Sequence, residues 1–353
     1  MRSLTVGRSV VAAATCALLA GSACGSTSTS NASPSKTIST AVPGAMSADW
    51  VKWDPKSCTI VPATAPSGAP WQAVLREKPG VRIGYATQSE AVAVVNLANA
   101  SMLSDTAKVK GEYVFADYFY PDAAKTIDAA KSITTRKADV VASWNLIVPS
   151  MDAVLGIYKT ACIPVIQISA KANGAVLFGP NNSEVGAKEG AGLVAWAKSK
   201  GLSGDGMTVL GVSTPSLGAS VNLRVSSCIS EVNKTFPNAV ASALQLAAST
   251  TAEGQTKTTD WLTANPTKKQ VLVCTNADTA AFGVANAAKS ANRGDQLAVA
   301  GVGGSTSPGG SFVGTVDFGF KNYGDFLVPL ALDLLEGKPV PATVSPALTF
   351  VAG

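Results

Sequence analysis

The stretch KADVVASWNLIVPSMDAVLGIYKTACIPVIQIS, residues 137–169, decides how this chain folds. It holds two short apolar runs, at residues 138–142 and 163–169. Between them lies a segment at 151–159 in which apolar residues recur at helical spacing. A buried strand, a helix and a second buried strand form the repeating unit of parallel sheets that are covered by helices. The stretch therefore predicts an α/β fold.

The same alternation of strand and helix continues on both sides of this stretch. It begins at about residue 81 and starts afresh after about residue 200, which predicts two lobes, each a doubly wound parallel sheet. In open sheets of this kind, ligands bind at the carboxyl ends of the strands. The other strands are expected at residues 81–86 and 112–119 in the first lobe, and at 207–212, 239–246, 270–276 and 296–304 in the second.

The N-terminus has the features of an export signal. Arg2 and Arg8 precede an uncharged, largely apolar run at residues 9–21, which has the length of a signal-peptide core. Small residues then lead into Cys24, as in the lipobox of bacterial lipoproteins, and this resemblance implies that Cys24 is acylated. An ordinary secretory signal that is cut nearby is the alternative. We predict a signal peptide at residues 1–23 and an extracytoplasmic protein that is lipid-anchored to the cell membrane.

The segment after Cys24 is rich in Ser, Thr, Asn and Pro up to about residue 45. It has too little apolar surface to offset the entropy of ordering it, so we expect a disordered tether over residues 24–49. Residues 50–80 form an N-terminal extension. Its three tryptophans and Cys58 suggest that it packs on the body of the protein.

The composition excludes several kinds of chemistry. The chain contains no histidine, which removes Ser-His-Asp catalysis, Cys-His catalysis and imidazole metal sites. It has no run of basic residues, so nucleic acid is not an expected partner. It also has no CxxC pair, which argues against a zinc or redox site. We predict a monomer that has no metal or cofactor and is not an enzyme. An exported enzyme that uses Glu90, Asp278 or Asp317 is the alternative.

Four cysteines follow Cys24, namely Cys58, Cys162, Cys228 and Cys274. An even number in an oxidising compartment permits two disulfides, with three possible pairings. A bond from Cys58 to Cys162 would staple the extension to the body. For Cys228 and Cys274, buried free thiols are an equal alternative.

Four stretches in order resemble the type I periplasmic substrate-binding proteins, in the branch of the ribose- and galactose-binding proteins. They are residues 137–169, SLGASVNLRVSSC at 216–228, TNADTAAFGVANAAKSA at 275–291, and GSFVGTVDFGFKNYGDFLVPLALDLLEGKPVP at 310–341. The resemblance implies two lobes that are joined by three crossing segments and close on one small molecule. It also implies delivery of that molecule to an ABC permease. The expected N-lobe is 81–180 plus 317–343, and the expected C-lobe is 181–316 plus 344–353.

The resemblance and the strand ends together select candidate ligand-binding residues. Arg224 matches the family arginine that meets the ligand. Asn276 follows a strand, and Asp278 opens the next helix, where capping that helix is its alternative role. The remaining candidates lie at other strand ends, and for each of them a packing or solvent-exposed role is the alternative: Gln88, Glu90, Trp144, Asn145, Asp317 and Phe318.

The expected ligand is a small polar molecule, and a sugar or polyol is the first choice. Two departures from the sugar binders favour a non-sugar ligand on the same scaffold. The first loop, TQSEAVAV at residues 87–94, lacks aromatic residues, and Gly303 stands where those proteins have an aspartate. Such a ligand could be amino-acid-like, aromatic or a signalling molecule. A ligand-sensing partner of a membrane receptor is a further alternative.

Overall fold

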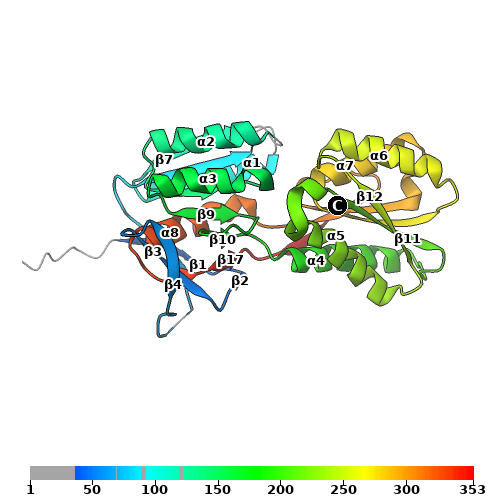
Figure 1. Ribbon diagram of the computed structural model, residues 1–353. Coiled ribbons are helices and arrows are strands. Elements are labelled where there is room, and N and C mark those ends of the chain that lie inside the picture. The colour runs from blue at the N-terminus through cyan, green and yellow to red at the C-terminus, as the bar shows by residue number, and fades with distance from the viewer. Residues whose placement is uncertain (1–35, 69, 89–92, 119–121) are drawn as a thin grey trace, which may run out of the picture. The chain divides into compact units, whose positions relative to one another are not determined.

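The computed structural model describes residues 36–68, 70–88, 93–118 and 122–353 (Figure 1). The predicted signal peptide, Cys24 and Glu90 lie outside these residues. None of the described helices is long and apolar enough to cross a bilayer.

The helices are α1 (Ala93–Lys108), α2 (Ala123–Thr135), α3 (Val148–Thr160), α4 (Asn182–Ser199), α5 (Gly218–Thr235), α6 (Thr251–Ala264), α7 (Asp278–Ser290) and α8 (Tyr323–Leu335), with short 3-10 turns η1 (Pro215–Leu217), η2 (Gly294–Gln296) and η3 (Phe320–Asn322). The strands are β1 (Thr37–Ala41), β2 (Ala45–Met46), β3 (Trp50–Asp54), β4 (Thr59–Ala63), β5 (Ala73–Arg76), β6 (Arg82–Gln88), β7 (Glu112–Tyr118), β8 (Val140–Ser143), β9 (Val165–Ile168), β10 (Val176–Phe178), β11 (Met207–Ser213), β12 (Val240–Gln245), β13 (Gln270–Thr275), β14 (Leu297–Val302), β15 (Phe312–Asp317), β16 (Val340–Pro341), β17 (Thr343–Ser345) and β18 (Thr349–Ala352).

The first lobe is built on a seven-stranded sheet in the order β2-β17-β10-β9-β8-β6-β7. Its strands pair in parallel except for β2, which runs antiparallel to β17. Alternate residues of a strand face opposite helix layers: Val140 and Ala142 pack toward α1 and α8, whereas Val141 packs toward α2 and α3. Because both faces are covered, these strands read in the sequence as continuous apolar runs.

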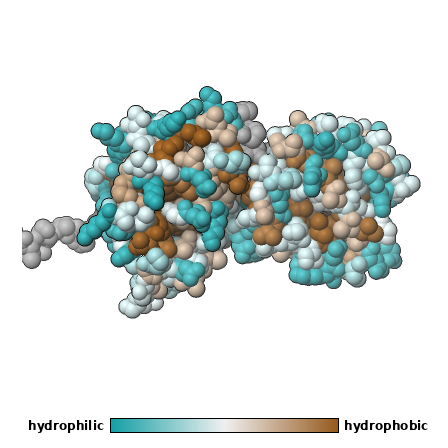
Figure 2. Space-filling view, viewed as in Figure 1, coloured by the Kyte–Doolittle hydropathy of each residue, from teal (hydrophilic) through white to brown (hydrophobic). Residues whose placement is uncertain are grey.

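The second lobe is built on a six-stranded sheet in the order β12-β11-β13-β14-β15-β18. Only β18 is antiparallel to its neighbour, β15. Leu210 and Val273 belong to the core under α6 and α7, and Val209 and Leu272 to the core under α4 and α5. On the face drawn in Figure 2, hydrophilic residues cover much of the outer surface of these helices, with hydrophobic residues in small groups between them.

The chain passes between the two sheets three times, at residues 179–181, 318–322 and 346–348. These segments follow β10, β15 and β17 respectively. The predicted fold class, two doubly wound lobes joined by three crossing segments, is confirmed. The predicted lobe boundary at residue 343 falls inside β17, which belongs to the first sheet as far as Ser345.

The predicted disordered tether extends too far along the chain. Residues 37–41 form β1, which pairs with β5, and residues 45–46 form β2, which pairs with β17. The composition predicted disorder up to residue 49 because these residues offer little apolar surface. Their backbone N–H and C=O groups pair with the edges of strands that are already formed, and composition does not register such pairing.

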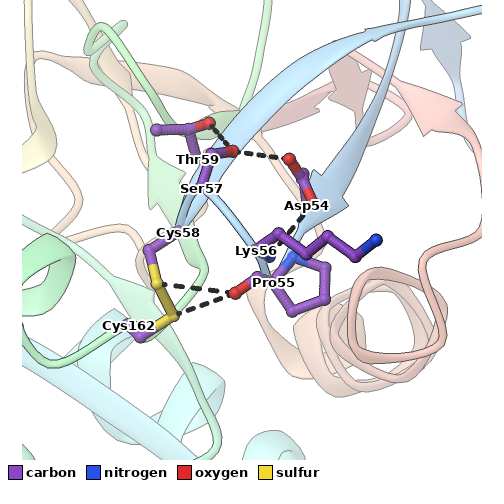
Figure 3. The surroundings of a disulfide bond; sticks show 7 residues. All are labelled: Asp54, Pro55, Lys56, Ser57, Cys58, Thr59 and Cys162. Carbon is purple, nitrogen blue, oxygen red and sulfur yellow. Dashed lines mark hydrogen bonds between the residues drawn. A yellow bond between two sulfur atoms is a disulfide. The ribbon is translucent and has the colours of Figure 1, made fainter.

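The N-terminal extension is fixed to the first lobe by a small sheet, by tryptophans and by a disulfide. Strands β16, β3 and β4 form the sheet, and Trp53 and Trp71 are buried in the core of the first lobe. Figure 3 shows the disulfide from Cys58 to Cys162, which links the turn after β3 to the end of α3. In that turn the Asp54 carboxylate accepts hydrogen bonds from the Lys56 amide, at 3.1 Å, and the Ser57 hydroxyl, at 2.6 Å.

A buried ion cluster joins the extension to α8. The Arg76 guanidinium lies 2.9 Å from Asp333 and 2.9 Å from Glu336, and the indole N–H of Trp71 donates to Asp333 at 2.9 Å. Because a buried charge is costly unless it is paired, each member of this cluster requires the others.

Replacing Trp71 by alanine tests how strongly the extension stabilises the first lobe. Trp71→Ala removes a buried indole and the hydrogen bond that its N–H donates to Asp333. We therefore expect a loss of about 3–5 kcal/mol in the free energy of unfolding. Val42→Ala, at a side chain that is 71% exposed, should change it by less than about 0.5 kcal/mol. Urea unfolding measures both values, and equal midpoints for the two variants would mean that the extension contributes no stability.

Candidate functional site

A cavity of about 320 Å³ lies at the carboxyl ends of strands from both sheets. This volume is in the range of small-molecule sites. Strands β6, β8 and β9 of the first lobe and β13 and β14 of the second end at this cavity. The lining residues are Gln88, Val94, Val95, Trp144, Leu146, Ser169, Leu217, Val221, Arg224, Ser249, Thr250, Thr251, Asn276, Ala277, Asp278, Thr279, Val302, Gly303, Ser305, Phe318 and Phe320.

Arg224 supplies a buried positive charge to the wall of the cavity. Its Nε donates to Oδ1 of Asn182 at 2.7 Å, and its Nη1 donates to the carbonyl of Asn276 at 3.0 Å. The guanidinium carbon lies 5.2 Å from the centroid of the Phe318 ring, within range of a cation–π interaction. Burial lowers the pKa of Arg224 to about 10, so the side chain remains protonated at neutral pH.

Asn276 lies directly after β13 and is fully buried. Its side-chain oxygen accepts from the Ser249 hydroxyl at 3.1 Å, and its side-chain nitrogen donates to Oδ1 of Asn222 at 3.4 Å. These contacts hold the amide in place at the cavity wall.

Asp278 does not cap α7. It is the first residue of that helix, Ala277 is the capping residue, and no side chain caps the helix. The carboxylate instead accepts from the Ser305 amide at 2.7 Å and from the Thr315 hydroxyl at 2.7 Å. Burial raises the pKa of Asp278, and these two hydrogen bonds oppose the shift.

Two glycines make room for this carboxylate. A Cβ atom at Gly301 would lie 2.2 Å from one oxygen of Asp278, and a Cβ at Gly303 would lie 2.9 Å from the other. The sequence departs from the sugar binders at Gly303, where those proteins have an aspartate. The side chain of Asp278 therefore lies directly against Gly303.

Aromatic residues form one side of the cavity. The rings of Trp144 and Phe320 stack with their centroids 5.3 Å apart and their planes 19° apart, and the Phe318 centroid lies 5.5 Å from that of Phe320. We call these three residues the aromatic wall. Gln88, at the end of β6, also lines the cavity.

Two predicted ligand-binding residues are not among the lining residues. The side chain of Asn145 shapes the turn that leads into α3: its oxygen accepts from the Ile147 amide at 2.8 Å, and its nitrogen donates to the Ser150 hydroxyl at 3.1 Å. The Asp317 carboxylate accepts from the Gly319 amide at 2.7 Å and shapes the turn after β15. In both cases a local backbone partner satisfies a side chain that the sequence places at a strand end. Glu90 lies outside the described residues.

Sequence reasoning missed several lining residues. Phe320 comes two residues after the predicted Phe318, and residues 249–251 follow the end of β12, so proximity to a strand end could have identified them. Leu217 lies in the turn after β11 and carries the same strand-end signal, whereas Val221 carries none, because an apolar residue at helical spacing predicts only a buried face.

A disulfide joins Cys228 of α5 to Cys274 of β13, so the free-thiol alternative does not hold. Cys228 follows Arg224 by about one helical turn, and Cys274 lies two residues before Asn276. The bond therefore fixes the helix that carries Arg224 to the strand that leads to Asn276.

Glu189 is a fully buried acid beneath the site. Its Oε1 accepts from the Thr275 amide at 2.7 Å, and its Oε2 has no hydrogen-bond partner among the described residues. Burial raises the pKa of Glu189 well above its usual value. No pattern in the sequence predicts this burial.

Comparison with known proteins agrees with this geometry. A family model described as a periplasmic binding protein domain matches residues 98–339, which is more than half of the chain. The chain therefore belongs to the periplasmic binding protein domain family. No curated protein matches the sequence.

Solved structures place the fold among type I periplasmic binding proteins. An ABC transporter solute-binding protein from Mycobacterium smegmatis, with bound glycerol, has a TM-score of 0.67 and 20% identity over 77% of this chain and 94% of that chain. One from Actinobacillus succinogenes, with bound D-allose, has a TM-score of 0.63 and 17% identity over 78% and 97%. The fructose-binding periplasmic domain of a hybrid two-component system has a TM-score of 0.65 and 20% identity over 77% and 90%. At such identities the likeness identifies the fold.

The pKa of Glu189 predicts a specific pH dependence of stability. The folded protein holds the Glu189 proton more tightly than the unfolded chain, whose glutamates titrate at about 4.3. The free energy of unfolding contributed by this group therefore falls as the pH rises from about 4.3 through the folded-state pKa. Glu189→Gln removes this contribution, so the variant should gain stability relative to wild type as the pH rises. Unfolding in urea at pH 4 to 8 measures the difference, and parallel pH profiles would show that Glu189 ionises normally.

Proposed function

We propose that this chain is an extracytoplasmic solute-binding lipoprotein that delivers a small polar molecule to an ABC importer. It is anchored to the membrane through Cys24 and captures its ligand between the two lobes. The observation that carries this proposal is the cavity itself. It lies at the carboxyl ends of both sheets and brings together Arg224, Asn276 and Asp278 from one lobe with Trp144 and Gln88 from the other.

Capture in this proposal depends on the three crossing segments. They act as the hinge about which the lobes close, and closure removes the ligand from water and strengthens its hydrogen bonds. The permease then recognises the closed form.

A sugar or polyol is the proposed ligand class. Support comes from the amide of Asn276 and the carboxylate of Asp278, since such groups bind hydroxyls. The aromatic wall is suited to the apolar face of a sugar ring. Solute-binding proteins of the same fold have bound glycerol and D-allose.

Two observations support alternatives, one for the class of ligand and one for the role of the protein. The aromatic wall and its aliphatic neighbours favour a ligand with an apolar ring, which need not be a sugar. The likeness to a periplasmic domain of a two-component system supports a ligand-sensing role beside a membrane receptor. Catalysis has less support, because both oxygens of Asp278 already accept hydrogen bonds from the protein.

A thermal-shift screen against sugars and polyols tests the proposal. A ligand at a hundred times its Kd adds about 2.7 kcal/mol to the free energy of unfolding, which raises Tm by about 2–4 °C per kcal/mol in a domain of 150–250 residues. We expect at least one such ligand to stabilise the protein and to be recovered unchanged, which separates binding from hydrolysis. Stabilisation by no sugar or polyol would contradict the proposed ligand class.

Asn276→Ala should weaken binding of that ligand by about tenfold, because it removes a buried amide from the cavity wall. Asn286→Ala is the matched control, since Asn286 is exposed on α7 and outside the cavity. Wild-type affinity in both variants would mean that the ligand binds elsewhere.

A further inference from the structure

Among the residues that the structure describes, the positive charge of Arg224 has no ion-pair partner. The ion pairs of the described residues all involve other groups. The two protein oxygens that the guanidinium contacts, Oδ1 of Asn182 and the carbonyl of Asn276, are both neutral. Asp278 and Glu189 lie near enough to affect Arg224 electrostatically, but neither pairs with it. A buried cation with only neutral partners favours an anion beside it.

The side-chain oxygens of Asp278 and Asn276 each accept a hydrogen bond from the protein already. Each oxygen of Asp278 accepts one hydrogen bond, and the side-chain oxygen of Asn276 accepts from Ser249. A hydroxyl both donates and accepts, so a neutral polyol can use these groups only through their remaining lone pairs. A carboxylate brings acceptors of its own to the guanidinium.

Donors, by contrast, remain available near the cavity. Nη2 of Arg224 forms none of the hydrogen bonds between described residues, and Nε1 of Trp144 is a buried donor without an acceptor among them. This imbalance between donors and acceptors favours a ligand that is rich in acceptors.

The aromatic wall begins at this charge. Phe318 lies under the guanidinium, and Phe320 and Trp144 continue the row, each ring within 5.5 Å of the next. Val221, Leu217 and Leu146 add aliphatic surface to the same cavity. A ring that packs against this wall would place a substituent at Arg224.

We propose that the solute is a small ring-bearing carboxylic acid, whose carboxylate pairs with Arg224 and whose ring packs on Phe318, Phe320 and Trp144. This inference rests on the proposed function of solute capture and specifies the charge of the solute. A sugar acid and an acid with an apolar ring would both offer this carboxylate, and the test below distinguishes the two.

Calorimetry with matched pairs of compounds tests the inference on the purified protein. The pairs are glucuronate with glucose, cyclohexanecarboxylate with cyclohexylmethanol, and benzoate with benzyl alcohol. We expect the acid of at least one pair to bind at least about tenfold more tightly than its neutral partner, as a charge-assisted hydrogen bond would provide. Arg224→Gln should abolish that preference, and Arg224→Lys should retain part of it.

Asp278→Asn provides a second variant that does not remove the arginine. It deletes the negative charge near Arg224, so the acid should bind more tightly, whereas a neutral polyol that uses the carboxylate as an acceptor should bind more weakly. Weaker binding of the acid to this variant would overturn the inference. Thermal unfolding of each variant verifies that it is folded.

The outcomes separate the inference from the proposed function. Glucose or another neutral compound that binds as tightly as its acid overturns the inference and leaves solute capture intact. Failure of every acid and every neutral compound to bind contradicts both. A preference for the acid that persists in Arg224→Gln overturns the assignment of the carboxylate to Arg224.

Discussion

The site depends on the burial of one guanidinium. Arg224 contacts Asn182 at the start of α4, the carbonyl of Asn276 after β13, and the Phe318 ring in the second crossing segment. Three parts of the chain that are distant in sequence therefore meet at one side chain. Because a buried charge needs partners, each of these parts is held where Arg224 can reach it. The disulfide from Cys228 to Cys274 adds a covalent link between the helix and the strand concerned.

The second lobe also bears the acidic part of the site, and its backbone is adapted to it. Gly301 and Gly303 leave the space that the Asp278 carboxylate occupies, and the amide of Ser305 donates a hydrogen bond to that carboxylate. The Asp278 carboxylate thus lies against Gly303, the position at which the sequence resemblance expected an aspartate. This carboxylate is already hydrogen-bonded by the protein, so the same fold can present a different balance of donors and acceptors to its ligand.

The first lobe contributes the apolar part of the site, and its core extends into the N-terminal extension. Its core includes Trp53 and Trp71 of the N-terminal extension together with Tyr323 of α8. Tyr323 in turn packs on Phe320 and Trp144 of the aromatic wall, with centroids 4.8 and 6.0 Å away. The extension therefore supports the element on which the wall rests, although it lies outside the cavity lining.

The sequence by itself determined the fold class, because strand–helix alternation and buried apolar runs are local patterns, and here the tertiary packing agrees with them. Of the residues that it predicted to bind the ligand, those that line the cavity are Arg224, Asn276, Asp278, Trp144, Gln88 and Phe318. Only the tertiary structure decided the disulfide pairing, the order in β1 and β2, the burial of Glu189, and the use of the Asn145 side chain in the turn before α3. Each of these depends on which partners surround a group in space, and pairing between distant segments leaves no periodic signal in the sequence.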